Sequence, residues 1–146
     1  MNSNYIIRDF SADDIKQINE IWQQTGLGNA ERGDNQKVIN NTIKIGGKFL
    51  VLENSDKNEI IGTSWITTDN RRLYLHHFGI KPEYQRMGLG MMLAKATLEF
   101  AKIKNMQIKL EVHKNNKGAI ELYKKIGFKY LGDYNVFIIR KIEQIL

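Results

Sequence analysis

Residues 73–93 read LYLHHFGIKPEYQRMGLGMML, and this stretch decides how the chain folds. Its first part, Leu73 to Ile80, is an apolar run typical of a largely buried strand, and Pro82 cannot continue a central strand. A turn containing Gly88 and Gly90 follows, and then a helix begins. Such a turn leaves few side chains between the backbone and a ligand, so successive amide N–H groups at the helix N-terminus can face an anion. The stretch predicts a site for a phosphate-bearing cofactor.

Two familiar phosphate-binding loops do not fit this turn. A dinucleotide-binding loop has the pattern G-x-G-x-x-G, and the third glycine is absent here. A P-loop ends in Gly-Lys-Ser or Gly-Lys-Thr, whereas Gly90 is followed by Met91 and Met92. The chain therefore lacks the lysine and the hydroxyl group with which a P-loop holds phosphates and magnesium.

The turn does satisfy the pattern Q/R-x-x-G-x-G/A, through Gln85, Gly88 and Gly90. In this it resembles the pyrophosphate loop of the GNAT superfamily of acetyl-coenzyme A dependent N-acetyltransferases. Residues 110–128 read LEVHKNNKGAIELYKKIGF and are similar to a second signature of that family, L-x-V-x-x-x-N-x-x-A-x-x-x-Y-x-x-x-G-F. The two signatures stand in the family's order, with one predicted helix and one predicted strand between them.

Length and composition set outer bounds on the molecule. With 146 residues, 42% of them hydrophobic, the chain is expected to form one domain over residues 1–146. It has no cysteine, which excludes disulfides, thiolate zinc sites and an acetyl-cysteine intermediate. We find neither a signal-peptide pattern nor a run of about 18 apolar residues. A cytoplasmic protein without membrane association is expected.

Charge is distributed unevenly along the chain. Residues 1–70 contain 7 Lys or Arg and 10 Asp or Glu, whereas residues 71–146 contain 15 and 6. The basic half carries the glycine loop and would favour the approach of coenzyme A, which bears a pyrophosphate and a 3′-phosphate. Solvated helix faces explain most of these lysines equally well. Nucleic-acid binding is disfavoured, because there is no run of basic residues with aromatic residues interleaved.

The hydrophobic pattern predicts an alternating series of strands and helices. Ser11 with Asp14 resembles a capping box before the first helix. The predicted strands are a first strand around Ile6 and Ile7, Phe49 to Leu52, Ile60 to Thr67, Leu73 to Ile80, Gln107 to Val112, Phe128 to Leu131 and Val136 to Ile139, the last two flanking a turn at Gly132-Asp133. The predicted helices are Asp13 to Gln24, Gln36 to Ile45, one that begins after the glycine loop with its apolar face running from Leu89 to Ala101, and Asn116 to Ile126.

The resemblance implies an α/β fold, with a splayed, mostly antiparallel mixed sheet and helices on both faces. It also implies that the pantetheine arm of acetyl-coenzyme A enters a gap between the strands at 73–80 and 107–112. The cofactor-binding set that it implies begins with the backbone of Phe78, Gly79 and Ile80. It continues through the loop with Gln85, Arg86, Met87, Gly88, Leu89, Gly90 and Met91, whose amides from Arg86 onward would hold the pyrophosphate.

Tyr123 is the candidate general acid. A tyrosine is protonated at neutral pH, and its proton can pass to a departing thiolate in a protein site. Asn116 lies two helical turns before it, on the same predicted helix face. The resemblance places Asn116 against the cofactor arm and Tyr123 at its sulfur. The simpler alternatives are a core tyrosine and a helix-capping asparagine.

The general base is left open between His76, Glu111 and water. A histidine titrates in the range that deprotonation of an amine requires, and strand alternation puts His76 on one face with Tyr74, Phe78 and Ile80. Acetyltransferases of protein N-termini carry a glutamate in an L-E-V stretch similar to the one around Glu111. The same alternation puts His77 on the opposite face, so no metal site is expected from this histidine pair, and no metal is expected elsewhere.

The sequence therefore predicts an N-acetyltransferase that moves the acetyl group of acetyl-coenzyme A directly to a primary amine of a small molecule or a protein. Transfer of a longer acyl group and a non-catalytic acyl-coenzyme A sensor remain as alternatives. Glu31 and Asp34 in the loop at 26–35 would favour a cationic amine, whereas the similarity at Glu111 favours a protein N-terminus. Homodimerisation stays open at this point.

Overall fold

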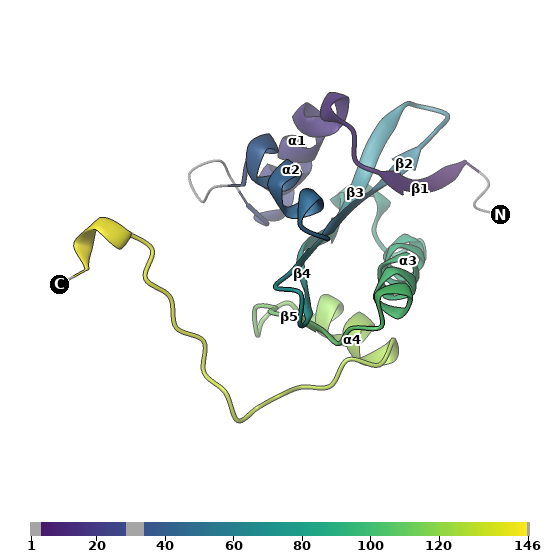
Figure 1. Cartoon of the computed structure of the whole chain (residues 1–146). Coiled ribbons are helices and arrows are strands. Elements are labelled where there is room, and N and C mark those ends of the chain that lie inside the picture. The colour runs from purple at the N-terminus through teal and green to yellow at the C-terminus, as the bar shows by residue number, and fades with distance from the viewer. Residues whose placement is uncertain (1–3, 29–33, 146) are drawn as a thin grey trace.

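The computed structural model describes residues 4–28 and 34–145, and its body is a mixed α/β structure (Figure 1). Its strands are β1 (Tyr5–Asp9), β2 (Lys48–Asn54), β3 (Glu59–Thr68), β4 (Leu73–Ile80) and β5 (Ile108–Leu110). Its α-helices are α1 (Ile15–Thr25), α2 (Gln36–Lys44), α3 (Leu89–Lys104) and α4 (Lys117–Lys125). These elements agree with the sequence predictions to within a few residues up to the end of α4.

The strands form one sheet in the order β1-β2-β3-β4-β5. All neighbours are antiparallel except β4 and β5, which run parallel. The β4–β5 pairing comprises only three residue pairs and ends at Leu75 opposite Leu110. From His76 to Ile80, the edge of β4 that faces β5 has no paired strand within the described residues. The expected splay of the sheet is therefore present at this point.

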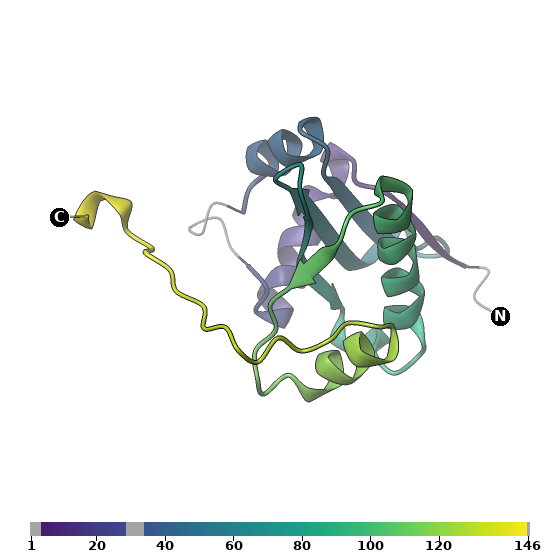
Figure 2. The same ribbon diagram turned by 60° about the horizontal axis from the view of Figure 1, so that its bottom comes forward.

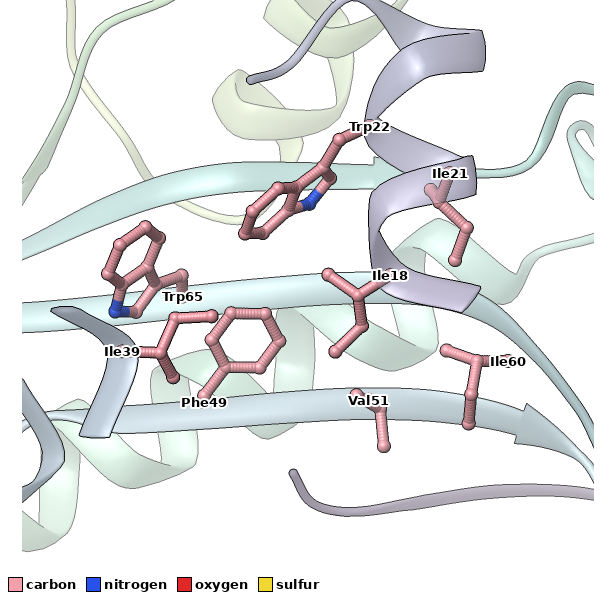
Figure 3. Close-up of a cluster of buried hydrophobic side chains, with 8 residues drawn as sticks. All are labelled: Ile18, Ile21, Trp22, Ile39, Phe49, Val51, Ile60 and Trp65. Carbon is pink, nitrogen blue, oxygen red and sulfur yellow. The ribbon is translucent and has the colours of Figure 1, made fainter. Parts of the chain in front are cut away.

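One face of the sheet is covered by α1 and α2, and the other by α3 and α4 (Figures 1 and 2). On the first face, Ile18, Ile21 and Trp22 of α1 pack onto apolar side chains of β2 and β3, with Ile39 of α2 beside them (Figure 3). Trp22 stacks on Trp65 with ring centroids 6.0 Å apart and also contacts Phe49. This cluster holds three of the four aromatic side chains that are buried in the described residues.

The opposite face is packed by the amphipathic helix that the sequence predicts after the glycine loop. Leu89 and Leu93 of α3 are buried against Leu52 and Ile61 of the sheet. Further along α3, the hydroxyl groups of Thr97 and Ser64 lie 2.7 Å apart in a buried hydrogen bond. α3 is therefore fixed to β3 by a polar contact as well as by apolar packing.

The start of α1 is stabilised as its sequence suggests. The backbone N–H of Ser11 donates to the Asp14 carboxylate at 2.8 Å, which is one half of the predicted capping box. Asp14 is buried and accepts two further hydrogen bonds from Arg8 of β1. The contact links β1 to the helix that packs over the sheet.

The two closing strands predicted at Phe128 to Leu131 and Val136 to Ile139 are wrong for this structure. No strand follows β5 in the part of the chain that the structure describes. After α4 the chain runs away from the body in an extended path and ends in a short 3-10 turn, Ile142–Gln144 (Figure 1). β-Propensity is realised only where a neighbouring strand supplies hydrogen-bond partners and a face to bury, and here no strand lies beside this segment.

The helices of the body are short or amphipathic. Within residues 4–28 and 34–145, none of them combines the length and the apolar character that crossing a lipid bilayer demands.

Candidate active site

The glycine loop connects β4 to α3, as the sequence predicts. A 3-10 turn at Pro82–Tyr84 ends the strand, and the Gln85 side chain donates to the carbonyl oxygen of Ile80 at 2.9 Å. Arg86 and Gly88 both have positive φ values, +63° and +81°, and Gly88 is the residue that precedes the first turn of α3. This backbone turns the amides after Arg86 toward the N-terminus of a 16-residue helix, where they suit an anion.

Leu89 and Gly90 take different parts in this turn. The Leu89 side chain is buried in the core, which anchors the first turn of α3. Gly90 faces Leu122 of α4 and Ile80 of β4, and a Cβ atom there would make only ordinary contacts of 3.5 and 4.0 Å. Met87 is exposed beside them.

A polar network anchors the segment that enters the loop. Glu59, at the start of β3, accepts hydrogen bonds from Lys81 at 2.8 Å and from the hydroxyl group of Tyr84 at 2.6 Å. Asn54 of β2 donates to the same hydroxyl oxygen. The bonds from Lys81 and Tyr84 lower the pKa of the Glu59 carboxyl, although partial burial opposes the shift. Two strands, β2 and β3, are thereby tied to the segment that enters the glycine loop.

A surface hollow of about 590 Å³ lies between α3 and α4, next to the loop. Met91 lines its end near the loop, and Lys95, Lys102 and Lys125 are among its other lining residues. Part of the predicted basic half of the chain is therefore gathered beside the proposed pyrophosphate site.

The open edge of β4 contains Phe78, Gly79 and Ile80, the three backbone positions expected to contact the cofactor. Phe78 and Ile80 point their side chains into the core on the α3/α4 face. A Cβ atom on Gly79 would lie 2.6 Å from Leu27, so Leu27 closes over the backbone on the opposite face. The backbone of β4 thus borders one side of the gap between β4 and β5. Tyr123 of α4 packs against Phe78 of that strand.

Tyr123 lies in the core below this gap. Its side chain is 7% exposed, and its ring meets Phe78 and Phe128 edge-on, with centroids 5.8 and 5.6 Å away. Burial raises the pKa of Tyr123 to about 12. The side chain contributes to the core, as the simpler alternative predicts, and it also packs against the strand that borders the gap.

Asn116 caps α4. Its side-chain oxygen accepts a hydrogen bond from the backbone N–H of Ala119 at 3.3 Å, the geometry of an N-cap residue. The capping alternative is therefore present in the structure. The amide NH₂ group of the same side chain is left as the part that can reach a ligand.

A β-bulge changes the predicted faces of β4. Thr63 pairs with Gly79 and Trp65 pairs with His76, so two residues of β4, His77 and Phe78, oppose the single residue Ser64. His77 has a φ of +48°. The prediction that His76 shares a face with Phe78 and Ile80 is wrong, because the bulge reverses the alternation between them. His76 does share its face with Tyr74, as predicted.

Both histidines consequently lie on the α1/α2 face, and the prediction that they point to opposite faces is also wrong. The His76 ring lies near Trp65 and Tyr74, and its Nε2 is 2.8 Å from the Thr67 hydroxyl oxygen. Burial among these groups lowers the pKa of His76, and the charge of His77 lowers it further, while Asp34 opposes both. The side chain still keeps an exposed surface toward solvent. A histidine in this state is neutral at neutral pH and can accept a proton.

His77 and Asp34 form a buried pair that sequence analysis missed. His77 Nε2 lies 3.1 Å from Asp34 Oδ2, and both side chains are mostly buried. The imidazole ring is held between Trp22 and Trp65, at centroid distances of 4.5 and 5.2 Å. A Cβ atom at Gly28 would collide with both members of the pair, so a glycine is required there. No local pattern reveals this pair, because it joins distant parts of the chain.

The remaining candidates are less closely tied to the site. Glu111 follows β5 directly and is exposed. Glu31 lies outside the described residues. Among the residues that are described, no three His, Cys, Asp or Glu side chains gather to hold a metal ion.

Comparisons with known proteins agree with this architecture. The sequence profile of the acetyltransferase (GNAT) family matches residues 15–128. The crystal structure of an acetyltransferase from Streptococcus agalactiae superposes with a TM-score of 0.77 at 19% identity, over 96% of this chain and 93% of that one.

Two curated relatives illustrate the range of similarity. The ribosomal protein bS18-alanine N-acetyltransferase of Haemophilus influenzae is 33% identical over 84% of this chain and 80% of its own length. The probable N-acetyltransferase san of Drosophila melanogaster is 43% identical, but over 43% of this chain and 35% of its own length. The chain thus spans about a third of the length of the second relative. On the profile match and on the similarity to the first, this chain belongs to the GNAT family of acetyltransferases.

Proposed function

We propose that the protein is an acetyl-coenzyme A dependent N-acetyltransferase that passes the acetyl group directly to a primary amine. The observation that carries the proposal is the edge of β4 at residues 76–80, which no strand of the described residues pairs on the β5 side and which leads directly into the glycine loop. Backbone hydrogen-bonding groups and an anion-binding turn are thereby brought together along one path. The path suits a cofactor with a peptide-like arm at one end and phosphates at the other.

On this proposal the cofactor is held mainly by the backbone. The amides of Arg86 to Met91 bind the pyrophosphate, and Gln85 fixes the turn through its bond to Ile80. The basic hollow beside Met91 receives the phosphate-bearing adenosine end. Phe78, Gly79 and Ile80 offer backbone groups to the pantetheine arm, and Asn116 offers its amide NH₂ group.

The acceptor amine then approaches from the α1/α2 face, where β4 presents its histidines. Attack on the thioester carbonyl builds negative charge on the oxygen, which a backbone N–H of the bulged strand would stabilise. A tyrosine with a pKa of about 12 transfers a proton to a thiolate only uphill. We therefore assign Tyr123 the role of a hydrogen-bond donor to the departing sulfur. Its hydroxyl group can pass a proton to the sulfur as the C–S bond of the thioester breaks.

His76 is the base that we favour. Its lowered pKa keeps the imidazole neutral at pH 7, and its position on the α1/α2 face matches the side from which the acceptor comes. Glu111 lies beyond the end of β5 and is exposed, so it would act only on an amine entering from that end. A water molecule between the amine and His76 is compatible with the same assignment.

The acceptor that we propose is a primary amine on a protein or a small molecule, and two observations bear on the choice. The relative from Haemophilus influenzae is an N-acetyltransferase of an alanine of ribosomal protein bS18, which favours a protein amine. Asp34 adds negative charge close beneath the acceptor face, 3.1 Å from His77 Nε2, which favours a cationic amine. We further propose a single domain over residues 1–146 that works in the cytoplasm, where acetyl-coenzyme A is available.

The proposal is tested by calorimetric titration with coenzyme A and by release of free thiol from acetyl-coenzyme A. The amine panel should include peptides that begin with alanine, methionine or serine, polyamines, and lysine derivatives. Binding together with amine-dependent thiol release supports the proposal. Failure to bind coenzyme A at millimolar concentration would overturn it. Binding without thiol release on the whole panel would replace it by the non-catalytic acyl-coenzyme A sensor. Thiol release only from longer acyl-coenzyme A forms would replace it by transfer of a longer acyl group.

A further inference from the structure

The backbone of His77 is the most tightly constrained point of β4. His77 belongs to the bulge opposite Ser64, and its φ of +48° is uncommon for a residue other than glycine. Its carbonyl oxygen accepts a hydrogen bond from the Thr63 hydroxyl group at 2.7 Å. The same hydroxyl oxygen accepts a hydrogen bond from the indole N–H of Trp22 at 3.1 Å. One hydroxyl group thus joins α1, β3 and the bulge.

The side chain of His77 bridges the segment that leaves α1 and the segment that enters α2. Gly28 follows α1 so closely against the ring that a Cβ atom there would lie 2.3 Å from His77 Nε2 and 2.6 Å from Asp34 Oδ2. Asp34 stands directly before Asn35, the N-cap residue of α2. His77 Nε2 and Asp34 Oδ2 are 3.1 Å apart, and their side chains are 15% and 12% exposed. Both segments therefore meet at one imidazole ring.

The contact between His77 and Asp34 is close without being aligned as a hydrogen bond. Among the described residues, Nε2 of His77 makes no hydrogen bond, although the carboxylate oxygen is 3.1 Å away. A buried polar nitrogen in this state costs stability, and the attraction of a nearby carboxylate offsets that cost. Removing Asp34 takes this attraction from the ring, and removing the ring takes it from Asp34. The two side chains are therefore expected to act as one unit.

We propose that His77 and Asp34 are a positioning pair that holds the start of α2 and the segment after α1 against the bulge of β4, and thereby sets the affinity for the acceptor amine. The inference rests on the proposed function, in which the acceptor meets β4 on the α1/α2 face. The proposed base, His76, directly precedes His77 in the strand, so movement of the bulge displaces it. The segment that enters the glycine loop is anchored separately, through Glu59. Cofactor binding should therefore not depend on the pair.

Three substitutions break the pair in different ways. Asp34→Ala removes the carboxylate, His77→Ala removes the ring, and Gly28→Ala keeps both groups but forces them apart. Each should raise KM for the acceptor found in the amine panel about 10-fold or more, because the acceptor site loses its alignment. The kcat and the calorimetric Kd of coenzyme A should change less than about twofold. The double variant Asp34→Ala/His77→Ala should raise KM no further than the stronger single variant, since both changes break one contact.

Two variants control for added bulk and for lost stability. Gly118→Ala adds the same methyl group where no other atom lies within 4 Å. Ile18→Val removes a methyl group from a fully buried side chain of α1 and lowers stability without touching the pair. Both should leave the acceptor KM unchanged. An equal rise of KM in Ile18→Val, additive effects in the double variant, or a parallel loss of coenzyme A affinity in the three test variants would overturn the proposal.

Amide hydrogen exchange tests the pair without acetyl transfer. Asp34→Ala should speed exchange in α2 (Gln36–Lys44) and leave exchange in α3 (Leu89–Lys104) unchanged, because only the former loses an attachment to β4. Unchanged exchange in α2 would overturn the positioning role. Failure of the parent protein to bind coenzyme A would instead overturn the proposed function, and the exchange result does not depend on that outcome.

Discussion

The two faces of the sheet are built on different physical principles. The α3/α4 face, on which we place the cofactor, relies on backbone geometry: a left-handed turn at Arg86 and Gly88, a helix N-terminus and an unpaired strand edge. The α1/α2 face, on which we place the acceptor, relies on side chains from distant segments, with the His77 ring enclosed by Trp22 and Trp65. The backbone geometry of the α3/α4 face can be recognised from a short sequence pattern. The side-chain contacts of the α1/α2 face join distant residues and can hardly be recognised from the sequence.

The two faces should also differ in the amino-acid substitutions that they tolerate. Backbone hydrogen bonds to a cofactor survive many side-chain changes, provided that the turn keeps its conformation. A stack of aromatic side chains depends on each member. We therefore expect substitutions on the acceptor face to act mainly on stability and those near the cofactor path to act mainly on binding and turnover.

The largest effect is expected from Trp22→Ala. Trp22 is 1% exposed, stacks on Trp65, and donates from its indole N–H to the Thr63 hydroxyl at 3.1 Å. Its loss should lower the free energy of unfolding by about 3–5 kcal/mol, measured by urea denaturation. Ile103→Ala, at an exposed position, should change it by no more than about 0.5 kcal/mol. A loss below about 1 kcal/mol for Trp22→Ala would contradict the importance of the aromatic stack.

Tyr123→Phe sharpens the comparison on the cofactor side. The ring contacts with Phe78 and Phe128 remain, so stability and coenzyme A affinity should stay close to those of the parent protein. Turnover should fall about 100-fold, because the sulfur loses its hydrogen-bond donor as the thioester breaks. Steady-state kinetics with a calorimetric Kd would separate the two quantities. Unchanged turnover would show that Tyr123 has only a packing role in the core and does not act on the sulfur.

The two glycines of the loop should respond differently. Gly88 has a φ of +81°, which a β-branched residue adopts only with strain of about 1–3 kcal/mol, so Gly88→Val should weaken coenzyme A binding about 10-fold or more. Gly90→Ala should change the Kd less than about twofold, since the added Cβ atom makes only ordinary contacts. Equal losses at both positions would show that bulk near the anion, and not backbone conformation, controls binding.

The smallest expected effect concerns the pH dependence of kcat/KM. Because the pKa of His76 is lowered from 6.5, its neutral form predominates at pH 7 and is lost as the pH falls through the lowered value. The rate should therefore decline on an acid limb centred below 6.5. His76→Gln should remove this limb, whereas His113→Gln, at an exposed position, should preserve it. An acid limb above 6.5 would argue for another base.

Much of the body was predictable because it follows local patterns. Short stretches of consecutive residues predict the strand at Leu73–Ile80, the turn at Gly88 and the apolar face of α3. Each stretch shows either a clear hydrophobic period or a residue that a particular backbone conformation requires. Where several of these patterns occur in the family's order, they specify the arrangement of the sheet as well.

The failures have two physical origins. The bulge at His77 and Phe78 adds one residue to β4. A prediction based on strict period-two alternation assumes that no residue is inserted, so it assigns the wrong face to the residues on one side of the bulge. Residues 128–139 have strong strand propensity, but a strand forms only beside a partner strand, and the local sequence does not specify that partner. The contact of His77 with Asp34 depends on the folded positions of α1, α2 and β4 together, so it was visible only in three dimensions.

The bulge in β4 makes the two surfaces of one strand independent of each other. It divides one strand into two halves, of which the first presents His76 and Tyr74 to one side and the second presents Phe78 and Ile80 to the other. On the proposed function, a change of residue in the first half would alter the surface that the acceptor meets and would leave the packing of Phe78 and Ile80 in place. One extra residue in a strand thus makes its two surfaces separately adjustable.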